Sequence, residues 1–135
     1  MTEREVNMDI RTHAKIDHRL CGTPVHTENG CSSVKMETCA DMAVDSPGLV
    51  HGGFIFGLAD HAAMIAVNDP CVVLGGTETR FLKPVQVGDT VVATAETGEV
   101  KGKKHTVSVD VARGEELVFQ GTFTCFVLDR HVLDI

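Results

Sequence analysis

The chain has 135 residues, a length that favours one domain over 1–135 and is enough to bury a hydrophobic core. A net charge of −7 argues against nucleic acid as a main partner, while 43% hydrophobic and 23% charged residues are ordinary for a globular protein. Asp60 and His61 interrupt the longest apolar run and the charged N-terminus lacks the apolar segment of a signal peptide, so we expect a cytoplasmic protein that does not span a membrane.

The first half of the chain predicts two helices with a strand between them. An imperfect stripe of apolar residues indicates a short N-terminal helix over about 8–20. Residues 33–37 alternate between polar and apolar side chains, which is typical of a half-buried strand. The run 48–70 is apolar or small at nearly every position and lies between Pro47 and Pro70, so it predicts one long helix that is buried on all its faces.

The second half predicts antiparallel strands joined by tight turns. We expect strands over 71–74 and 77–82, 90–99, 105–112 and 117–128, with turns at 87–89, 101–104 and 113–116. Gly75 and Gly76 interrupt the first of these strands, as a β-bulge or where a ligand nears the backbone. Short connections make hairpins. The fold class is therefore α+β, with a core over about 25–128 in which a sheet wraps the long central helix.

Two features of the long helix require more than packing to explain them. His51, Gly52 and Gly53 stand at its start, where glycine lets a ligand approach free backbone N–H groups at the positive end of the helix dipole. Asp60 lies within the apolar run, although a buried carboxylate is costly unless it is paired. It follows Gly53 by two turns, so both face nearly the same way. This arrangement predicts an acyl-transfer site; the alternatives are a capping role for Asp60 and a core position for His51.

The cysteines and histidines indicate no metal site. The seven histidines show neither H-x-x-x-H nor HExxH spacing. The five cysteines are odd in number and contain no CxxC pair. We therefore expect reduced, mostly buried thiols and no metal.

Three groups of residues are similar to the motifs of a known family. They are Val50-His51-Gly52-Gly53, Leu58-Ala59-Asp60 with Ala62-Ala63, and Phe81-Leu82-Lys83-Pro84 followed by Gly88-Asp89. These motifs resemble those of hot-dog fold proteins, specifically the PaaI-like acyl-CoA thioesterases, and the order of elements matches over about 25–127. The resemblance implies a long central helix wrapped by an antiparallel β-sheet. It also implies a hydrolase that converts an acyl-CoA thioester to free acid and CoA, with no cofactor besides the CoA of its substrate.

The resemblance further implies roles for single residues. The amide of Gly53 would polarise the thioester carbonyl, Asp60 would act as general base or nucleophile, and His51 would shape the helix start. The protein would be a homodimer or homotetramer in which Gly53 of one subunit faces Asp60 of the other. CoA would lie along the subunit interface with its phosphates near basic loops. The candidate substrate-binding residues are Gly52, Asp45, His61, Thr77, Thr79, Arg80, Lys83, Lys101, Lys103 and Lys104; for the lysine cluster the alternative is a solvated turn.

The sequence departs from the family pattern at three places. His61 follows Asp60 where relatives often carry a small polar or uncharged residue; it would either pair with Asp60 and lower its pKa, or simply pack. No serine stands where some relatives hold the attacking water, and Thr77 or Thr79 would replace it. Asp45 lies upstream of the helix, where some relatives carry asparagine or another polar residue.

A second functional class remains as the alternative: a hot-dog module that binds acyl-CoA without hydrolysing it, as in the ligand domains of fatty-acid regulators, and that acts through a protein partner. The intact pair of Gly53 and Asp60 favours the enzyme, whereas His61 and the missing serine favour the binding module. A dehydratase acting on hydroxyacyl thioesters is a third option, disfavoured because such enzymes usually carry a different arrangement of histidine and acid.

Overall fold

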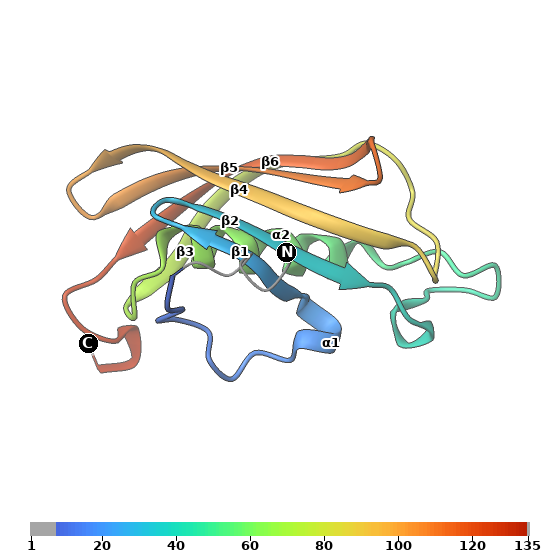
Figure 1. Cartoon of the computed structure of the whole chain (residues 1–135), viewed down its shortest axis with the longest axis horizontal. Coiled ribbons are helices and arrows are strands. Elements are labelled where there is room, and N and C mark those ends of the chain that lie inside the picture. The colour runs from blue at the N-terminus through green and yellow to red at the C-terminus, as the bar shows by residue number, and fades with distance from the viewer. Residues whose placement is uncertain (1–7, 135) are drawn as a thin grey trace.

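The computed structural model describes residues 8–134 as one curved sheet over one long helix (Figure 1). The strands are β1 (Thr23–Glu28), β2 (Cys31–Glu37), β3 (Val72–Phe81), β4 (Thr90–Lys101), β5 (Lys104–Arg113) and β6 (Glu116–Val127). The helices are α1 (His18–Cys21) and α2 (Gly52–Val67), with short 3₁₀ turns at Ala40–Met42 and Val132–Asp134. All pairings are antiparallel, in the order β1-β2-β4-β5-β6-β3. The expected α+β class is confirmed.

The long helix α2 lies where its composition predicts it. It begins after His51, whose backbone is extended, and ends at Asn68, whose backbone is left-handed with φ 53°. Nine of its residues are buried, among them four alanines that allow the sheet to approach closely. Burial on all faces is nevertheless wrong for a single protomer, because Gly53 is exposed and Gly57 and Asp60 are only half-buried. These three residues follow one face of the helix, which no described residue fully covers.

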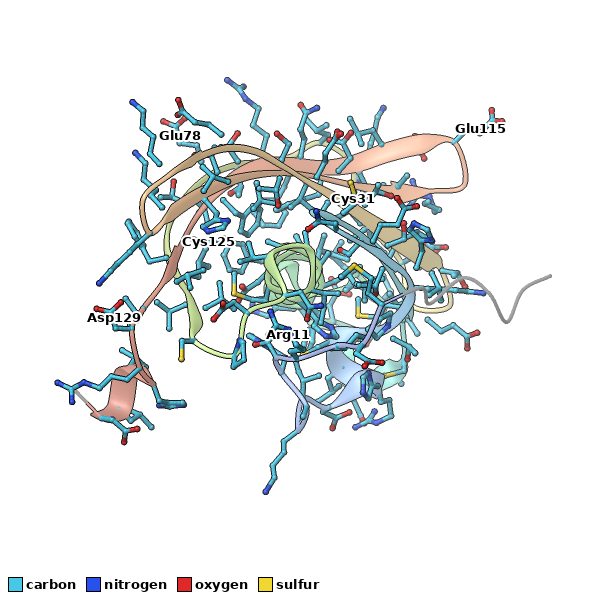
Figure 2. The ribbon with its side chains drawn as sticks, turned by 60° about the vertical axis from the view of Figure 1, so that its left-hand side comes forward. Arg11, Cys31, Glu78, Glu115, Cys125 and Asp129 are labelled. Carbon is cyan, nitrogen blue, oxygen red and sulfur yellow. The ribbon has the colours of Figure 1, made fainter. Side chains whose placement is uncertain are left out.

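Alternation along β4, β5 and β6 separates an inner face of the sheet, toward α2, from an outer face. The inner face carries the fully buried side chains of Val91, Ala93, Ala95, Val107, Val109, Val111, Phe119, Phe123 and Cys125. The helix packs mainly over β2, β4 and β5 and less over β3 and β6. Figure 2 looks nearly along α2 and shows the sheet curving over it, with the segment around Arg11 on its other side. The inner face near β3 is therefore the less covered part of the sheet.

The glycine signals in the second half correspond to a bulge and two turns. The register of β3 against β6 shifts between Leu74 and Gly76, which confirms the predicted β-bulge. A methyl group at Gly75 would overlap the ring of Phe126, so close approach requires glycine there. Gly102 and Gly114 both have φ 60° in the β4–β5 and β5–β6 turns, as the strand spacing predicts.

The predicted helix over 8–20 is wrong, because only His18–Cys21 is helical in this region. The backbone before it bonds to a distant side chain: Arg11 N–H donates to Asn68 Oδ1 at 2.7 Å, and Asn68 Nδ2 donates to the Asp9 carbonyl at 2.8 Å. His13 has a left-handed backbone (φ 58°), which is incompatible with a continuous helix. Tertiary hydrogen bonds thus replace the local ones that a helix would form.

The edge strand β1 was not anticipated from the sequence, because its residues are largely polar and include Pro24. An edge position tolerates proline, since one side of an edge strand donates no ladder hydrogen bond. Within the described residues, no helix is long and apolar enough to cross a membrane.

Candidate functional site

The start of α2 presents backbone amides that lack a side-chain cap. His51 occupies the N-cap position, and its side chain makes no capping hydrogen bond. Its backbone is held in place, since His51 N–H donates to the Met42 carbonyl at 2.9 Å and its carbonyl accepts from Phe54 N–H at 3.0 Å. The first-turn amides of Gly52 and Gly53 have no acceptor within the helix. They carry the positive end of the helix dipole, which favours a negative charge at this point.

Side chains stand close beside both glycines. A methyl group at Gly53 would come 3.0 Å from the ring of His51, and one at Gly52 would come 3.2 Å from Cε2 of Phe81. His51 is exposed and lies edge-on to Phe54, with 6.1 Å between ring centroids. It is therefore not a core histidine, and it borders the helix start. The two glycines leave room there that alanine would fill.

Asp60 is a half-buried carboxylate whose buried oxygen has no partner among residues 8–134. Its Oδ1 atom is buried and accepts no hydrogen bond from any described residue. Burial raises the pKa of Asp60 to about 6. Burial, together with the charge of Asp60, also raises the pKa of the Cys125 thiol to about 12, so this cysteine stays protonated and is a poor nucleophile. A half-buried carboxylate with a raised pKa and an unpaired oxygen is a candidate functional group.

Gly53 and Asp60 lie on the same face of α2 but are far apart along the helix axis. Seven residues at 1.5 Å per residue separate them by about 10 Å along the helix axis. One carbonyl group cannot contact both the Gly53 amide and the Asp60 carboxylate of the same helix. A site that uses both groups on one carbonyl therefore needs a second protomer to supply one of them.

His61 points away from this face. Its Nδ1–H donates to the Cys21 carbonyl at 3.0 Å, and its ring is stacked on His13 and tilted against His18, with centroids 6.1 and 6.0 Å away. The side chain is 2% exposed, and burial lowers its pKa. Of the two predicted alternatives the structure shows packing, without the pairing to Asp60. The N-terminal segment covers the His61 side chain, and the substrate-binding role of His61 stays a prediction.

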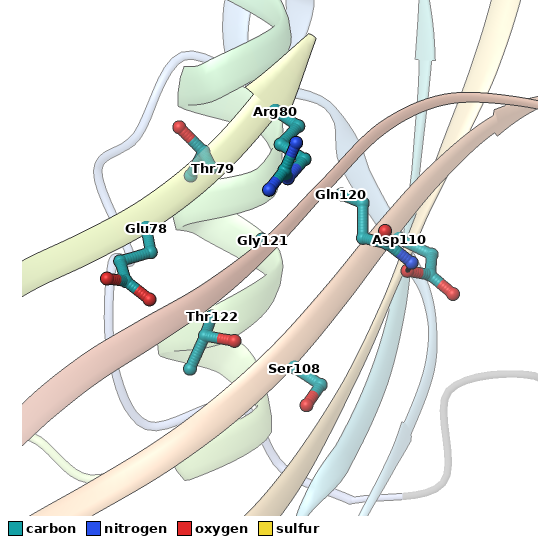
Figure 3. Close-up of a pocket in the computed structure, with 8 residues that line it drawn as sticks. All are labelled: Glu78, Thr79, Arg80, Ser108, Asp110, Gln120, Gly121 and Thr122. Carbon is teal, nitrogen blue, oxygen red and sulfur yellow. Dashed lines mark hydrogen bonds between the residues drawn. The ribbon is translucent and has the colours of Figure 1, made fainter. Parts of the chain in front are cut away.

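The predicted residues of β3 divide between the two faces of the sheet. Thr77 and Thr79 lie on the inner face, and a methyl group at Gly121 would come 2.6 Å from Cγ2 of Thr79. Arg80 lies on the outer face, in a depression of about 680 Å³ that also contains Asp110. Figure 3 shows this depression with the helix behind the sheet. Arg80 is therefore separated from the helix start by the sheet itself.

The lysine turn lies at the opposite end of α2 from Gly53. The Lys103 carbonyl accepts from Val127 N–H at 2.9 Å, and the neighbouring Leu128 N–H donates to the carbonyl of Cys71, just past the end of α2. The Lys103 ammonium also pairs with Asp129 at 2.9 Å. Within one protomer, Lys101, Lys103 and Lys104 therefore do not lie beside the helix start.

Two other candidates do lie near the helix start. Asp45 shapes the loop before α2, because its Oδ1 accepts the N–H groups of Gly48 and Leu49, both at 3.0 Å. Lys83 lines a small pocket beside Gly52. Phe81 also borders this pocket. The sequence analysis placed it in a family motif but not among the site residues; its place at the end of a strand, two residues before Lys83-Pro84, was the available signal. No group of three metal-binding side chains occurs among residues 8–134.

Comparison with known proteins assigns the family. The sequence model of the Thioesterase superfamily matches residues 47–119, more than half of the chain, from the loop before α2 to β6. The chain belongs to the thioesterase superfamily. Its sheet and central helix form the hot-dog fold of these proteins, and it is PaaI-like, as its motifs indicated.

Two solved structures support this assignment. The uncharacterized protein PH1136 of Pyrococcus horikoshii is 53% identical, with a TM-score of 0.94 over 96% of this chain and 99% of that one. A variant of the phenylacetic acid degradation protein PaaI of Thermus thermophilus is 31% identical, with a TM-score of 0.74 over 81% of this chain and 95% of that one.

Two curated relatives are longer proteins. The methylthioribose-1-phosphate isomerase of Aquifex aeolicus is 50% identical over 90% of this chain, which spans 27% of that protein. The transcription factor FapR of Caldanaerobacter subterraneus is 31% identical over 72% of this chain, which spans 48% of that protein. The chain thus spans half or less of the length of these curated relatives.

Proposed function

We propose that this protein hydrolyses acyl-CoA thioesters to a free acid and CoA. The observation that carries the proposal is Asp60, a half-buried carboxylate whose Oδ1 has no partner among residues 8–134 and whose pKa burial raises to about 6. It lies on the same helix face as the uncapped amide of Gly53. A base with a pKa near the working pH and a donor for a developing oxyanion are the groups that acyl transfer to water needs.

In the proposed mechanism two protomers place their α2 helices side by side in opposite directions. Gly53 N–H of one protomer donates to the thioester oxygen, where the helix dipole stabilises the negative charge. Asp60 of the second protomer takes a proton from water, whose oxygen bonds to the carbonyl carbon. The C–S bond then breaks, and the proton passes to the sulfur of CoA. Direct attack by Asp60, followed by hydrolysis of the anhydride, gives the same products.

The alternative proposal is an acyl-CoA-binding module without turnover. Its support is the similarity to FapR, a transcription factor, over 72% of this chain. The small pocket beside Gly52 and the backbone amides at the start of α2 would hold the ligand. Asp60 would then be a binding residue. This alternative predicts binding without release of CoA.

Release of free CoA from short, long and aromatic acyl-CoAs tests the proposal. Chromatographic detection is needed, because the four partly exposed cysteines would react with a thiol dye. Release that saturates with substrate supports the enzyme. If acyl-CoA raises the melting temperature but no CoA is released from any member of the panel, the proposal is wrong and the binding module replaces it.

The pH dependence of hydrolysis should report the pKa of Asp60. Because the ionised carboxylate is the active form, kcat/KM should fall about tenfold per pH unit below about pH 6 and level off above it. An aspartate of ordinary pKa would leave the rate flat over that range. The measurement is kcat/KM from about pH 5 to about pH 8. A His51→Gln variant should keep the same midpoint; a midpoint that disappears in it would assign the titration to His51 and contradict this prediction.

A further inference from the structure

A small apolar pocket of about 250 Å³ lies beside the first turn of α2. Its floor is made by the buried side chains of Val50, Ile55, Val85 and Val118. Its rim includes Phe81 and Leu82, which are 57% and 41% exposed. Large apolar side chains grouped in this way at a concave surface are typical of a binding site.

The backbone holds this pocket open. The N–H groups of Leu82 and Lys83 both donate to the Val118 carbonyl, at 2.8 and 3.3 Å, so the chain after β3 stays attached to β6. The Phe81 ring lies edge-on to the buried ring of Phe119, with 5.0 Å between centroids. Gly52 has no side chain that would collide with the Phe81 ring. The pocket therefore exists before any ligand binds.

We propose that this pocket receives the acyl group of the substrate and restricts it to short apolar chains, with Phe81 and Leu82 as specificity-determining residues. The inference rests on the proposed hydrolysis of acyl-CoA. The pocket adjoins Gly52 and so lies next to the amide at which the thioester oxygen would be held. Its lining contains one charged residue, Lys83, and no carboxylate.

Volume limits the acyl group. Pockets for drug-sized ligands measure about 300–1,000 Å³, and this one is smaller. A methylene that enters an apolar pocket raises kcat/KM about tenfold or more, and one that no longer fits adds nothing. Activity should therefore increase from acetyl-CoA to butyryl- or hexanoyl-CoA and fall at palmitoyl-CoA.

Two variants of opposite effect test the assignment on the full chain. Phe81→Ala enlarges the pocket and should raise kcat/KM for palmitoyl-CoA at least about tenfold relative to acetyl-CoA. Leu82→Phe narrows the rim and should shift the preference toward acetyl-CoA. The matched control is Phe126→Leu, on the outer face near Gly75, which should keep the wild-type chain-length profile. Both rim positions are exposed, so these variants should fold.

The outcomes separate the two proposals. An unchanged chain-length profile in both rim variants, with CoA release intact, overturns the pocket assignment and leaves the hydrolase standing. A preference for succinyl-CoA over butyryl-CoA overturns the apolar specificity and assigns the selection to Lys83. A change of oligomeric state in Phe81→Ala at an unchanged profile overturns the assignment in favour of a contact between protomers. If the wild type releases no CoA, the proposed hydrolysis is wrong. The pocket assignment is then tested by the rise in melting temperature with each acyl-CoA: a larger rise with butyryl- or hexanoyl-CoA than with palmitoyl-CoA supports it, and no such order overturns it.

Discussion

Replacing Asp60 by asparagine should lower kcat for acyl-CoA hydrolysis by about 10²–10⁴. The amide is nearly the same size as the carboxyl group but cannot accept the proton of water. Because the lost interaction forms in the transition state, KM should change little. Chromatographic measurement of CoA release at about pH 7.5, above the expected pKa of Asp60, gives the full effect.

The matched control is Asp110→Asn, the same chemical change on the exposed outer face of the sheet. It should retain wild-type activity.

Thermal stability gives a second readout, because burial raises the pKa of Asp60 to about 6. The folded state then holds its proton more tightly than the unfolded state, so stability falls as pH rises from about 4 to about 6, by at most about 3 kcal/mol. Asp60→Asn should therefore melt higher than wild type above pH 6; lower activity together with lower stability would indicate a damaged fold and contradict the catalytic role.

The substitution Gly22→Ala should lower the free energy of unfolding by about 2–5 kcal/mol. Gly22 follows α1 with φ 92°, a backbone conformation that residues with a side chain rarely adopt. A methyl group there would also come 2.6 Å from Leu58 Cδ1 and 2.8 Å from Val34 Cγ1, both in the core. Unfolding in urea measures the loss as a lower midpoint at an unchanged slope.

Gly114→Ala is the control for this prediction, because it separates backbone strain from overpacking. Gly114 has φ 60°, and a methyl group there would meet no heavy atom within 4 Å. Alanine should cost only the left-handed conformation, about 1 kcal/mol. Equal losses at the two positions would show that the contacts with Leu58 and Val34 cost nothing, contrary to our expectation.

Local signals predicted most of the secondary structure. Prolines bounded α2, Gly75 marked the bulge in β3, and alternating valines placed one face of β5 in the core. Each of these signals acts through the backbone or through periodicity, over a few residues. The same reasoning wrongly predicted a helix in the N-terminal segment, because the Arg11 backbone bonds to Asn68, 57 residues away.

The sequence by itself determined that Gly53 and Asp60 share one face of a helix, because helical periodicity makes residues two turns apart neighbours in direction. Only the tertiary structure decided the surroundings of that face. Strand register turned Arg80 to the outer face and Thr79 to the inner one, and the N-terminal segment covered His61. Register and segment docking depend on contacts between residues far apart in the chain, which composition and spacing do not specify.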